Sequence, residues 1–406
     1  MIAQALVSFF ASFTSVFFVL IYQCYPMPMQ PQYRFSRSSH HFGGADEPSI
    51  WQKIHVDPWL TLLLLSICFI GLSILYSAST QDMNMVTRQM VSYVIAFVVM
   101  FAMAQVPPSI YKALTPIFYV MGIILLLLVE IIGEVRMGAQ RWIRIPGFGS
   151  VQPSEFMKLG MPMMCAWYLS RRDLPPNLVS VFTTLTIIIV PVLLIAKEPD
   201  LGTSILVASS GIFVLFLSGL PWWMIGTAVA IFVPFVAMAW EFLLHDYQRQ
   251  RVMTLLNPDT DALGAGWNII QSKTAIGSGG LTGKGYLQGT QSHLHFLPEG
   301  HTDFIIAAFS EEFGLFGVML LIFMYACLLL RALHISFVNP DTYGRLLAGA
   351  IAMSFFVYVF VNIGMVGGIL PVVGVPLPFI SYGGTAIITL MAGFGLLMSI
   401  HTHHTK

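Results

Sequence analysis

Long apolar segments alternate with short polar connections along most of the chain. After residue 57, ten segments of roughly 20 residues carry few charges, and this is the length that crosses the hydrocarbon core of a bilayer. The pattern predicts membrane helices over 58–78, 89–107, 110–133, 153–170, 177–196, 201–219, 222–244, 302–331, 345–368 and 380–400. Pro, Gly and charge clusters separate them. We therefore expect an all-α polytopic membrane protein with about ten transmembrane helices.

One connection is much longer than the others. Residues 245–301, between the seventh and eighth segments, are polar and rich in glycine. Connections longer than about 15 residues are uncommon in compact proteins and usually serve a function or are disordered. This connection is therefore a candidate functional region.

The first 50 residues differ from the rest. Residues 1–23 are apolar and uncharged, and residues 24–50 are polar. A secretory signal would begin with a basic region, which is absent. Two interpretations stay open: an additional membrane segment, or upstream sequence that is not translated, with Met27 or Met29 as a later start. In either case, residues 51–406 are predicted to form the membrane domain.

Composition supports the membrane assignment and excludes some functions. The chain is 56% hydrophobic and 9% charged, whereas soluble domains carry about 25% charged residues. Its net charge of zero provides no basic field for nucleic acid. The four cysteines have neither disulfide-framework nor metal-ligand spacing. The sequence therefore requires no cofactor, although a divalent cation remains possible.

Basic residues give only a weak indication of topology. If the N-terminal tail is inside, and the long connection is set aside, nine Lys and Arg lie inside and six outside. Cations retained on the disfavoured side usually have a function. The simplest such function is to bind an anionic ligand.

Charged residues cluster where the eighth segment begins, in LPEGHTDF. Glu299, His301 and Asp303 lie within five residues, and Thr302 is a candidate helix N-cap. Asp303 in a first helical turn could simply complement the helix dipole, which contributes under about 1 kcal/mol. Ionisable residues at membrane depth are nevertheless functional candidates, and a carboxylate can act as a general base.

Two more carboxylates follow in the same segment. Glu311 and Glu312 lie about 12–14 Å further along a helix. They would lie in the bilayer core unless they face the protein interior. One interpretation is an internal hydrogen bond or ion pair between helices, and the other is a direct catalytic role.

The motif QPSEFMKLG opens the fourth segment. Ser154 is a candidate N-cap, and Glu155 and Lys158 share one helix face. The pair could be an ordinary local ion pair. Because it lies in the first turns of a membrane helix, it also requires a polar cavity.

Basic side chains near these motifs suit an anionic ligand. Arg141 and Arg144 flank Trp142, and arginine is a forked donor to phosphate. Trp142 could equally be an interfacial belt residue. Arg249 and Lys273 add cations in the long connection.

The glycine run AIGSGGLTGKG, residues 275–285, matches neither nucleotide-binding glycine motif. Its backbone N–H groups could still bind a phosphate, or the run could be a flexible loop.

Residues 362–384 contain Pro371, Pro376 and Pro378 in an otherwise apolar stretch. Non-helical backbone at membrane depth lies in a protein interior or beside a cavity. This segment is therefore predicted to line one.

The last segment, NIGMVGGILPVVGVPLPFISYGG, resembles the signature of the SEDS family (shape, elongation, division, sporulation), whose members include RodA and FtsW. GAQRWIRIPGFGSVQPSEFMKLG, KEPDLGTS and LPEGHTDFIIAAFSEEFG agree with it, most closely with its rod-shape branch. The resemblance covers about residues 50–400, and only residues 1–50 depart from it.

This resemblance implies a protein of the bacterial cytoplasmic membrane with ten transmembrane helices and both ends cytoplasmic. The connection 245–301 would be a large extracytoplasmic loop between helices seven and eight. The implied activity is a peptidoglycan glycosyltransferase that polymerises lipid II into glycan strands for cell elongation and rod shape. An α-linked donor and a β-1,4 product imply inversion.

The family's essential acidic residue matches Asp303, which we expect to deprotonate the acceptor hydroxyl. Pyrophosphate leaves, so cations are needed there. The expected substrate-binding residues are Glu155, Lys158, Arg141, Trp142, Arg249, Lys273, Glu299 and His301. The expected structural and cavity-shaping residues are Glu311, Glu312, Pro371, Pro376, Pro378 and Ser381.

Implied partners are a class B penicillin-binding transpeptidase, the membrane proteins of the rod complex, and lipid II itself as substrate. Two alternatives stay open. A lipid II flippase would also need a polar cavity, but it predicts cytoplasm-facing pyrophosphate contacts, and the inner loops offer only Arg171 and Arg172 as a cluster. The other alternative is a non-catalytic scaffold that activates the transpeptidase.

Overall fold

The computed structural model describes most of the membrane domain. The described residues are 50–136, 139–145, 149–242, 246–258, 265–293 and 299–403. The interpretations of residues 1–49, including the two candidate start sites, lie outside this set.

Helices occupy all ten predicted segments. They are α3 (Pro58–Ala78), α4 (Met83–Gln105), α5 (Pro108–Ile132), α6 (Pro153–Leu169), α7 (Leu178–Lys197), α8 (Leu201–Leu217), α9 (Trp222–Phe242), α13 (Ile305–Val338), α14 (Thr342–Val366) and α15 (Gly384–Thr402), preceded by the short α2 (Ile50–Lys53). By length and composition, eight helices in the described part can span a membrane. The helices α6 and α8 are shorter, with 17 residues each. The predicted all-α membrane architecture is confirmed.

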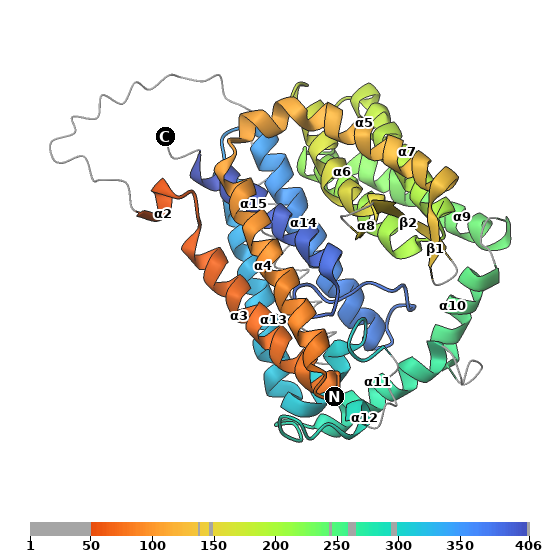
Figure 1. The fold of residues 1–406 in the computed structure, drawn as a ribbon. Coiled ribbons are helices and arrows are strands. Elements are labelled where there is room, and N and C mark those ends of the chain that lie inside the picture. The colour runs from red at the N-terminus through yellow and green to blue at the C-terminus, as the bar shows by residue number, and fades with distance from the viewer. Residues whose placement is uncertain are drawn as a thin grey trace.

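The helices form two groups joined through α14 (Figure 1). In one group α4 packs on α15, and α13 packs on α3 and α14; in the other, α5, α6, α7 and α8 pack together. The helix α14 also contacts α6 and α8, which connects the two groups. The helix α9 stands at the edge of the second group, and none of its described side chains is buried.

Side-chain contacts identify the two ends of the bundle. At one end Asp57, before α3, pairs with Arg331 of α13 and lies 3.8 Å from His401 of α15. At the other end Ser77 of α3 donates a hydrogen bond to Glu312 of α13. The start of α3 and the end of α15 therefore lie on the same side, which agrees with the expectation that both ends are cytoplasmic.

A small antiparallel sheet lies between α5 and α6, where the sequence suggested a polar loop. Its strands are β1 (Glu134–Arg136), β2 (Ala139–Ile145) and β3 (Gly149–Val151), in the order β1-β2-β3. The sequence signal was the run of Arg141, Trp142, Ile143, Arg144 and Ile145. Aromatic and β-branched residues such as Trp142, Ile143 and Ile145 are enriched in strands, but the order of polar and apolar residues does not alternate strictly, so the signal was weak.

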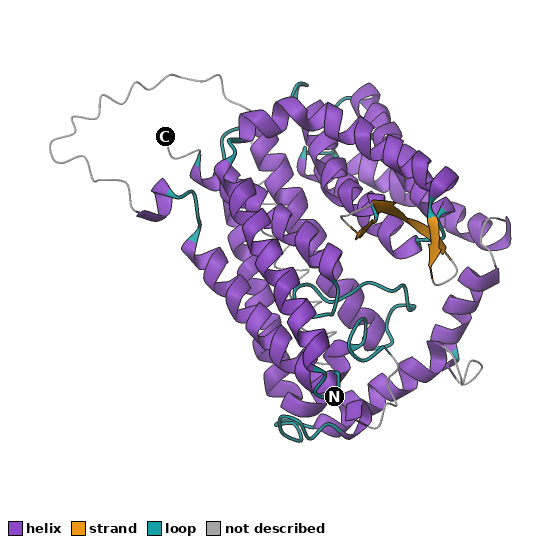
Figure 2. Cartoon of the chain, in the orientation of Figure 1, coloured by secondary structure: helices purple, strands orange, loops and turns teal. Residues whose placement is uncertain are grey.

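The long connection is also more ordered than a loop. It contains α10 (Asp246–Leu256), α11 (Ala265–Gly279) and α12 (Thr290–His293), which are drawn as helix in Figure 2. The helix α11 packs on α13. The connection therefore continues the helical architecture outside the predicted spans.

The helix α13 differs from its prediction in two ways. Its N-cap is Phe304 rather than Thr302, so Asp303 precedes the helix, and its backbone breaks at Gly314 (φ 63°, ψ −164°). Its 34 residues would measure about 51 Å, whereas a bilayer core is about 30 Å thick. The part after the break is long enough to span. Glu311 and Glu312 lie just before the break and are buried in the protein interior, which agrees with the interpretation of internal hydrogen bonds or ion pairs.

Candidate active site

A polar cavity of about 300 Å³ opens at the extracytoplasmic end of the bundle. Its walls come from β2, the N-terminal turns of α6, α8 and α15, the residues just before α8, α10, and the stretch before α15. The lining residues are Arg141, Trp142, Gln152, Glu155, Lys158, Pro199, Asp200, Leu201, Thr203, Leu206, Arg251, Val373, Gly374, Val375, Pro376, Thr385 and Ala386. The motifs singled out in the sequence thus meet at one place.

The stretch between α14 and α15 is non-helical and is held by polar side chains from the helices around it. Tyr93 and Tyr325 donate hydrogen bonds to the carbonyls of Phe379 and Pro378, each at 2.6 Å. Gln89 donates to the carbonyl of Ser381 at 3.1 Å. Buried backbone groups need such partners where no helix supplies them. The prediction that this proline-rich segment is buried and lines a cavity is confirmed.

The turn that carries Asp303 is fixed against this segment. Ser381 donates its hydroxyl to the carbonyl of Thr302 at 2.6 Å, and the Tyr382 N–H donates to the carbonyl of His301 at 3.0 Å. Asn362 of α14 donates to the carbonyls of both Asp303 and Val375, at 2.8 and 2.7 Å. The position of Asp303 is therefore set by its own backbone carbonyl and those of its neighbours.

The Asp303 carboxyl lies at the edge of the cavity. Its Oδ2 is 3.6 Å from the position that a β-carbon on Gly374 would occupy, and Gly374 lines the cavity. Burial, and secondarily the charge of Glu299, raises the pKa of Asp303 from 3.8 to about 6. A carboxylate with a pKa near neutrality can exchange a proton with a bound hydroxyl at physiological pH.

Glu155 and Lys158 form an ion pair in the cavity wall, as predicted. The Lys158 Nζ lies 2.5 Å from Oε1 of Glu155, and each side chain is about 10% exposed. The Nζ also lies 5.3 Å from the ring centre of Tyr358. The buried Oε2 of Glu155 has no hydrogen-bond partner in the described part of the chain. An acceptor of this kind is available to a donor on a ligand.

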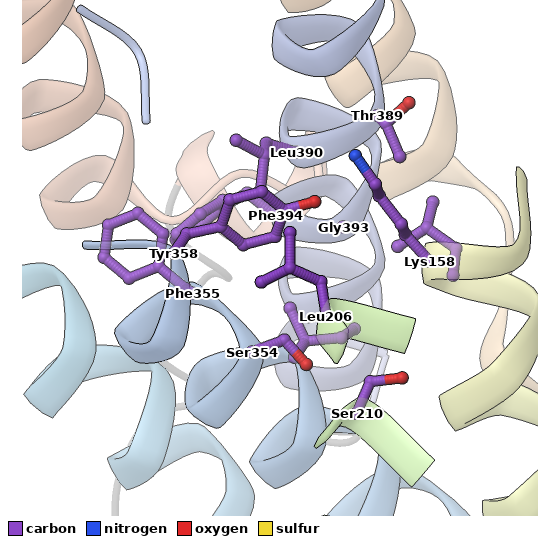
Figure 3. A pocket seen from close by; sticks show the side chains of 12 residues that line it. Lys158, Leu206, Ser210, Ser354, Phe355, Tyr358, Thr389, Leu390, Gly393 and Phe394 are labelled. Carbon is purple, nitrogen blue, oxygen red and sulfur yellow. The ribbon is translucent and has the colours of Figure 1, made fainter. Parts of the chain in front are cut away.

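Lys158 also borders a second, mostly apolar cavity of about 30 Å³, deeper in the bundle (Figure 3). Ser210, Ser354 and Thr389 line it, and each hydroxyl already donates to its own helix backbone.

The α6 N-cap differs from the prediction. It is Gln152, and Ser154 lies buried within the first turn, because Pro153 occupies the first helical position.

Arg141 and Trp142 both line the cavity, as predicted for substrate-binding residues. The Arg141 guanidinium donates to the carbonyls of Glu198 at 3.0 Å and Pro199 at 2.5 Å. It also lies 3.7 Å from the Asp200 carboxylate. Arg141 therefore holds the KEPD turn, residues 197–200, in place, and its role in phosphate binding stays a prediction.

Glu198 in this turn is buried, and neither of its carboxylate oxygens has a hydrogen-bond partner among the described residues. Burial, with the nearby Asp200 as the second cause, raises the pKa of Glu198 to about 8. The side chain is therefore protonated at pH 7, and the turn does not hold an uncompensated charge.

Some predicted cations lie elsewhere. Among the described residues that line the cavity, Arg251 of α10 is present, whereas Arg249 and Lys273 are not. Arg249 donates to the carbonyl of Glu241 at 2.9 Å. Lys273 is exposed, and its Cε lies 2.3 Å from where a β-carbon on Gly368 would be.

Glu299 and His301 shape the turn beside Asp303. Glu299 accepts a hydrogen bond from the Thr302 hydroxyl at 2.6 Å, and its backbone carbonyl accepts from the Phe304 N–H at 3.1 Å. The ring of His301 packs edge-on against Tyr382, with 6.4 Å between centres. Both side chains support the geometry of the turn that carries Asp303.

Sequence reasoning missed Gln152, Asp200, Thr385 and Arg251 as cavity residues. Gln152 donates to Asp200 at 3.1 Å, which links the start of α6 to the KEPD turn. The available signal was the presence of Asp200 in KEPDLGTS, a motif already quoted for the family resemblance. Gln89 and Asn362 were also missed, although a lone amide in an apolar segment is itself a signal.

The described residues contain no group of three or more His, Cys, Asp or Glu that could hold a metal ion. The acidic cavity residues, Glu155 and Asp200, are engaged with Lys158, Gln152 and Arg141. The donor set in the described part of the chain therefore does not form a metal site by itself.

Comparison with known proteins gives one consistent result. The family model described as a cell cycle protein, FtsW/RodA/SpoVE, matches residues 58–406. The peptidoglycan glycosyltransferase MrdB of Escherichia coli K12 is 52% identical over 358 residues, which cover 88% of this chain and 96% of that protein. Stage V sporulation protein E of Bacillus subtilis is 34% identical over 86% of this chain and 98% of its own length.

Solved structures show the same fold. One comes from work on the structural coordination of polymerization and crosslinking by a peptidoglycan synthase complex. It aligns with a TM-score of 0.76 at 28% identity, over 86% of this chain and 98% of that chain. The rod shape determining protein RodA of Thermus thermophilus aligns with a TM-score of 0.66 at 26% identity, with the same coverage of both chains.

Proposed function

Because this chain belongs to the SEDS family of FtsW, RodA and SpoVE proteins, we infer that it is a peptidoglycan glycosyltransferase of the RodA type. It is a multi-pass protein of the bacterial inner membrane, it acts in cell elongation, and it works with a class B penicillin-binding transpeptidase.

The substrate of the proposed reaction is lipid II, a disaccharide-pentapeptide on undecaprenyl pyrophosphate. The 4-hydroxyl oxygen of an acceptor GlcNAc attacks the anomeric carbon of the donor sugar. A glycosidic C–O bond forms, the C–O bond to pyrophosphate breaks, and the hydroxyl proton passes to a base. One displacement at an α-linked donor gives the β product, so inversion needs one base and no covalent sugar–enzyme bond.

Asp303 is the proposed base, and one observation carries the assignment. A carboxyl of raised pKa stands at the edge of a polar cavity, on a turn whose backbone is pinned by Asn362 and Ser381. A base must be placed within hydrogen-bond reach of the proton that it takes, and its best pKa lies near the working pH. The buried, pinned turn provides both conditions.

Cations that line the cavity are proposed to supply charge for the leaving group. Lys158 and Arg251 line the cavity, and negative charge that develops on a departing pyrophosphate is stabilised by fixed cations. Glu155 holds Lys158 in place and has one oxygen that can accept a hydrogen bond from the sugar. Arg141 contributes indirectly, because it fixes the turn before α8.

No step of this proposal passes through a metal ion. A divalent cation bound together with the pyrophosphate would add positive charge near the leaving oxygen. Dependence on such a cation is a separate question that chelation of the purified complex can answer.

The test compares wild type with Asp303→Asn, each purified with its transpeptidase partner, and follows polymerisation of lipid II on gels. Asn keeps the shape of the side chain but cannot accept the proton, so we expect loss of activity by about 100-fold or more. Glu299→Gln is the matched comparison, because it removes a neighbouring charge on the same turn while the Gln carbonyl oxygen can still accept the hydrogen bond from the Thr302 hydroxyl. We expect it to retain most of the activity at pH 7.

Two results would contradict the proposal. Full activity of Asp303→Asn would remove Asp303 as the base. If wild type makes no glycan strands but moves lipid II across liposomes, the protein is a transporter. Circular dichroism of each variant shows that the fold is retained.

A further inference from the structure

Glu311 lies outside the cavity, yet it is the most heavily hydrogen-bonded carboxylate in the described part of the chain. It is fully buried, and its Oε1 lies 2.6 Å from the Nζ of Lys284. The same oxygen accepts from the Thr290 N–H at 2.9 Å and its hydroxyl at 3.0 Å, and the Gln291 N–H lies 3.1 Å from both oxygens. One side chain therefore joins α13 to two points of the long connection.

These contacts surround the break in α13. At Gly314 the helix loses its regular backbone bonds, and the glycine run supplies replacements. The N–H groups of Lys284 and Gly285 donate to the carbonyls of Glu311 and Glu312, at 3.0 and 3.1 Å. The N–H groups of Leu315 and Phe316 donate to the carbonyls of Gly280 and Leu281, at 3.0 and 3.1 Å. We name residues 279–291 and the break at Gly314 together the clamp.

The glycines of the clamp allow this close approach. A β-carbon on Gly279 would stand 2.1 Å from the carbonyl oxygen of Ser310, and one on Gly283 would stand 2.0 Å from that of Glu312. No side chain fits at such distances from backbone. The glycine run is therefore built to receive the broken helix, and it need not be a phosphate loop.

The clamp contacts the end of the N-terminal part of α13, which directly follows the Asp303 turn. This part, from Ile305 to Phe313, is about 12 Å long, so a tilt of about 5° at the break would move its start by about 1 Å. The same connection leads back through α11 to α10, which carries Arg251 on the cavity wall. The clamp is therefore connected both to the turn that carries the proposed base, Asp303, and to α10, which carries Arg251.

We propose that Glu311, through its ion pair with Lys284, is a positioning residue that fixes the Asp303 turn for glycosyl transfer. This inference rests on the proposed function of Asp303. Glu311 does not line the cavity. Its effect would reach the reaction through the tilt of the N-terminal part of α13, residues 305–313.

The experiment uses the complex of the full chain with its transpeptidase partner and measures lipid II polymerisation over a range of pH. Glu311→Gln keeps the shape of the side chain but removes the charge that Lys284 requires. We expect kcat to fall about 10- to 100-fold, as a misplacement of about 1 Å can produce, with little change in KM for lipid II. The acid limb of the pH profile should move to lower pH, because a loosened turn admits water to the Asp303 carboxyl.

Variants of Lys284 complete the test. Lys284→Met should resemble Glu311→Gln, and the double variant should be no worse than either, since both remove one interaction. Lys284→Arg keeps the charge and should restore activity. Thr282→Ala, on the exposed part of the same loop, is the matched control and should behave as wild type.

The proposal is overturned if Glu311→Gln lowers only the unfolding temperature, while kcat and the acid limb stay as in wild type. It is also overturned if the Glu311 and Lys284 effects simply add. Inclusion of Asp303→Asn in the same series separates the two hypotheses. Full activity of that variant would remove the proposed function of Asp303, whatever Glu311 does.

Discussion

At the scale of single residues, the site depends on one carboxyl whose surroundings change its proton affinity. Asp303 is held by its backbone carbonyl, while its side chain stands in a largely buried position beside Glu299. Burial disfavours the charged form, and a neighbouring negative charge acts in the same direction. The pKa of Asp303 is therefore about 6, and the base form is the main one at neutral pH.

The pH dependence of polymerisation should reflect the titration of Asp303. A base works only when deprotonated, so we expect activity to fall as pH drops through about 6, the pKa of Asp303. Glu299→Gln removes the second cause of the raised pKa, and the acid limb should therefore move to lower pH. Initial rates between pH 4.5 and 8.5 at saturating lipid II measure the acid limb of the wild type and that of Glu299→Gln.

An unchanged acid limb in Glu299→Gln would show that Glu299 has no influence on the group that titrates. A limb that persists in the residual activity of Asp303→Asn would show that another group is titrating. The first result would leave burial as the cause of the raised pKa of Asp303, whereas the second would require the assignment of the acid limb to Asp303 to be withdrawn.

At the scale of elements, α13 depends on the glycine run that fills its break. Gly283 has a positive φ of 80°, and its missing β-carbon leaves room for the Glu312 carbonyl. Gly277 belongs to α11, and a β-carbon there would meet no atom within 4 Å. Position 283 therefore requires glycine, whereas position 277, six residues earlier, has room for a side chain.

Alanine substitution at these two positions should have different effects on stability and activity. Gly283→Ala adds the cost of a positive φ, about 1–2 kcal/mol, and forces backbone apart, so we expect a clear fall in unfolding temperature and in activity. Gly277→Ala gains helix propensity of up to about 1 kcal/mol and should unfold at the same temperature or higher. Thermal unfolding in detergent measures both. Equal behaviour of the two variants would contradict the role assigned to the clamp.

At the scale of the whole molecule, an ion pair between a buried carboxylate and a partly exposed arginine joins α3 to α13 at the cytoplasmic end of the bundle. The Asp57 side chain is fully buried, caps α3 through the N–H groups of Trp59 and Leu60, and lies 2.7 Å from Arg331 of α13. Lys112 and Asp341 form a second pair, at 3.3 Å, with side chains 33% and 48% exposed. The two pairs have similar chemistry and different burial.

Removal of the cation should therefore lower the free energy of unfolding by different amounts in the two pairs. Arg331→Met leaves a buried carboxylate without its cation, and we expect a loss of roughly 2–5 kcal/mol in the free energy of unfolding. Lys112→Met breaks a partly exposed pair and should cost less than about 1 kcal/mol. Denaturant or thermal unfolding of the two variants in the same detergent makes the comparison. Similar losses in both would show that burial of Asp57 does not control this end.

The ten helices and the proline-rich segment could be predicted from the sequence because each depends on local properties. Apolar length decides which segments can cross a bilayer, and Pro371, Pro376 and Pro378 rule out a regular helix wherever the chain goes. The break at Gly314 could not be predicted in this way, since its lost backbone bonds are replaced by residues 280–285, about 30 positions away. The same holds for the sheet, whose strands stabilise one another.

The sequence by itself determined the class of protein, the number of long helices and the charged motifs from which the site is built. Only the tertiary structure decided which charges meet. It placed Arg251 on the cavity in place of Arg249, engaged Arg141 with the KEPD turn, and buried Glu311 in the clamp. The physical reason is that hydrophobic length is a property of consecutive residues. A pKa, an ion pair or a cavity depends on side chains that folding brings together from distant parts of the chain.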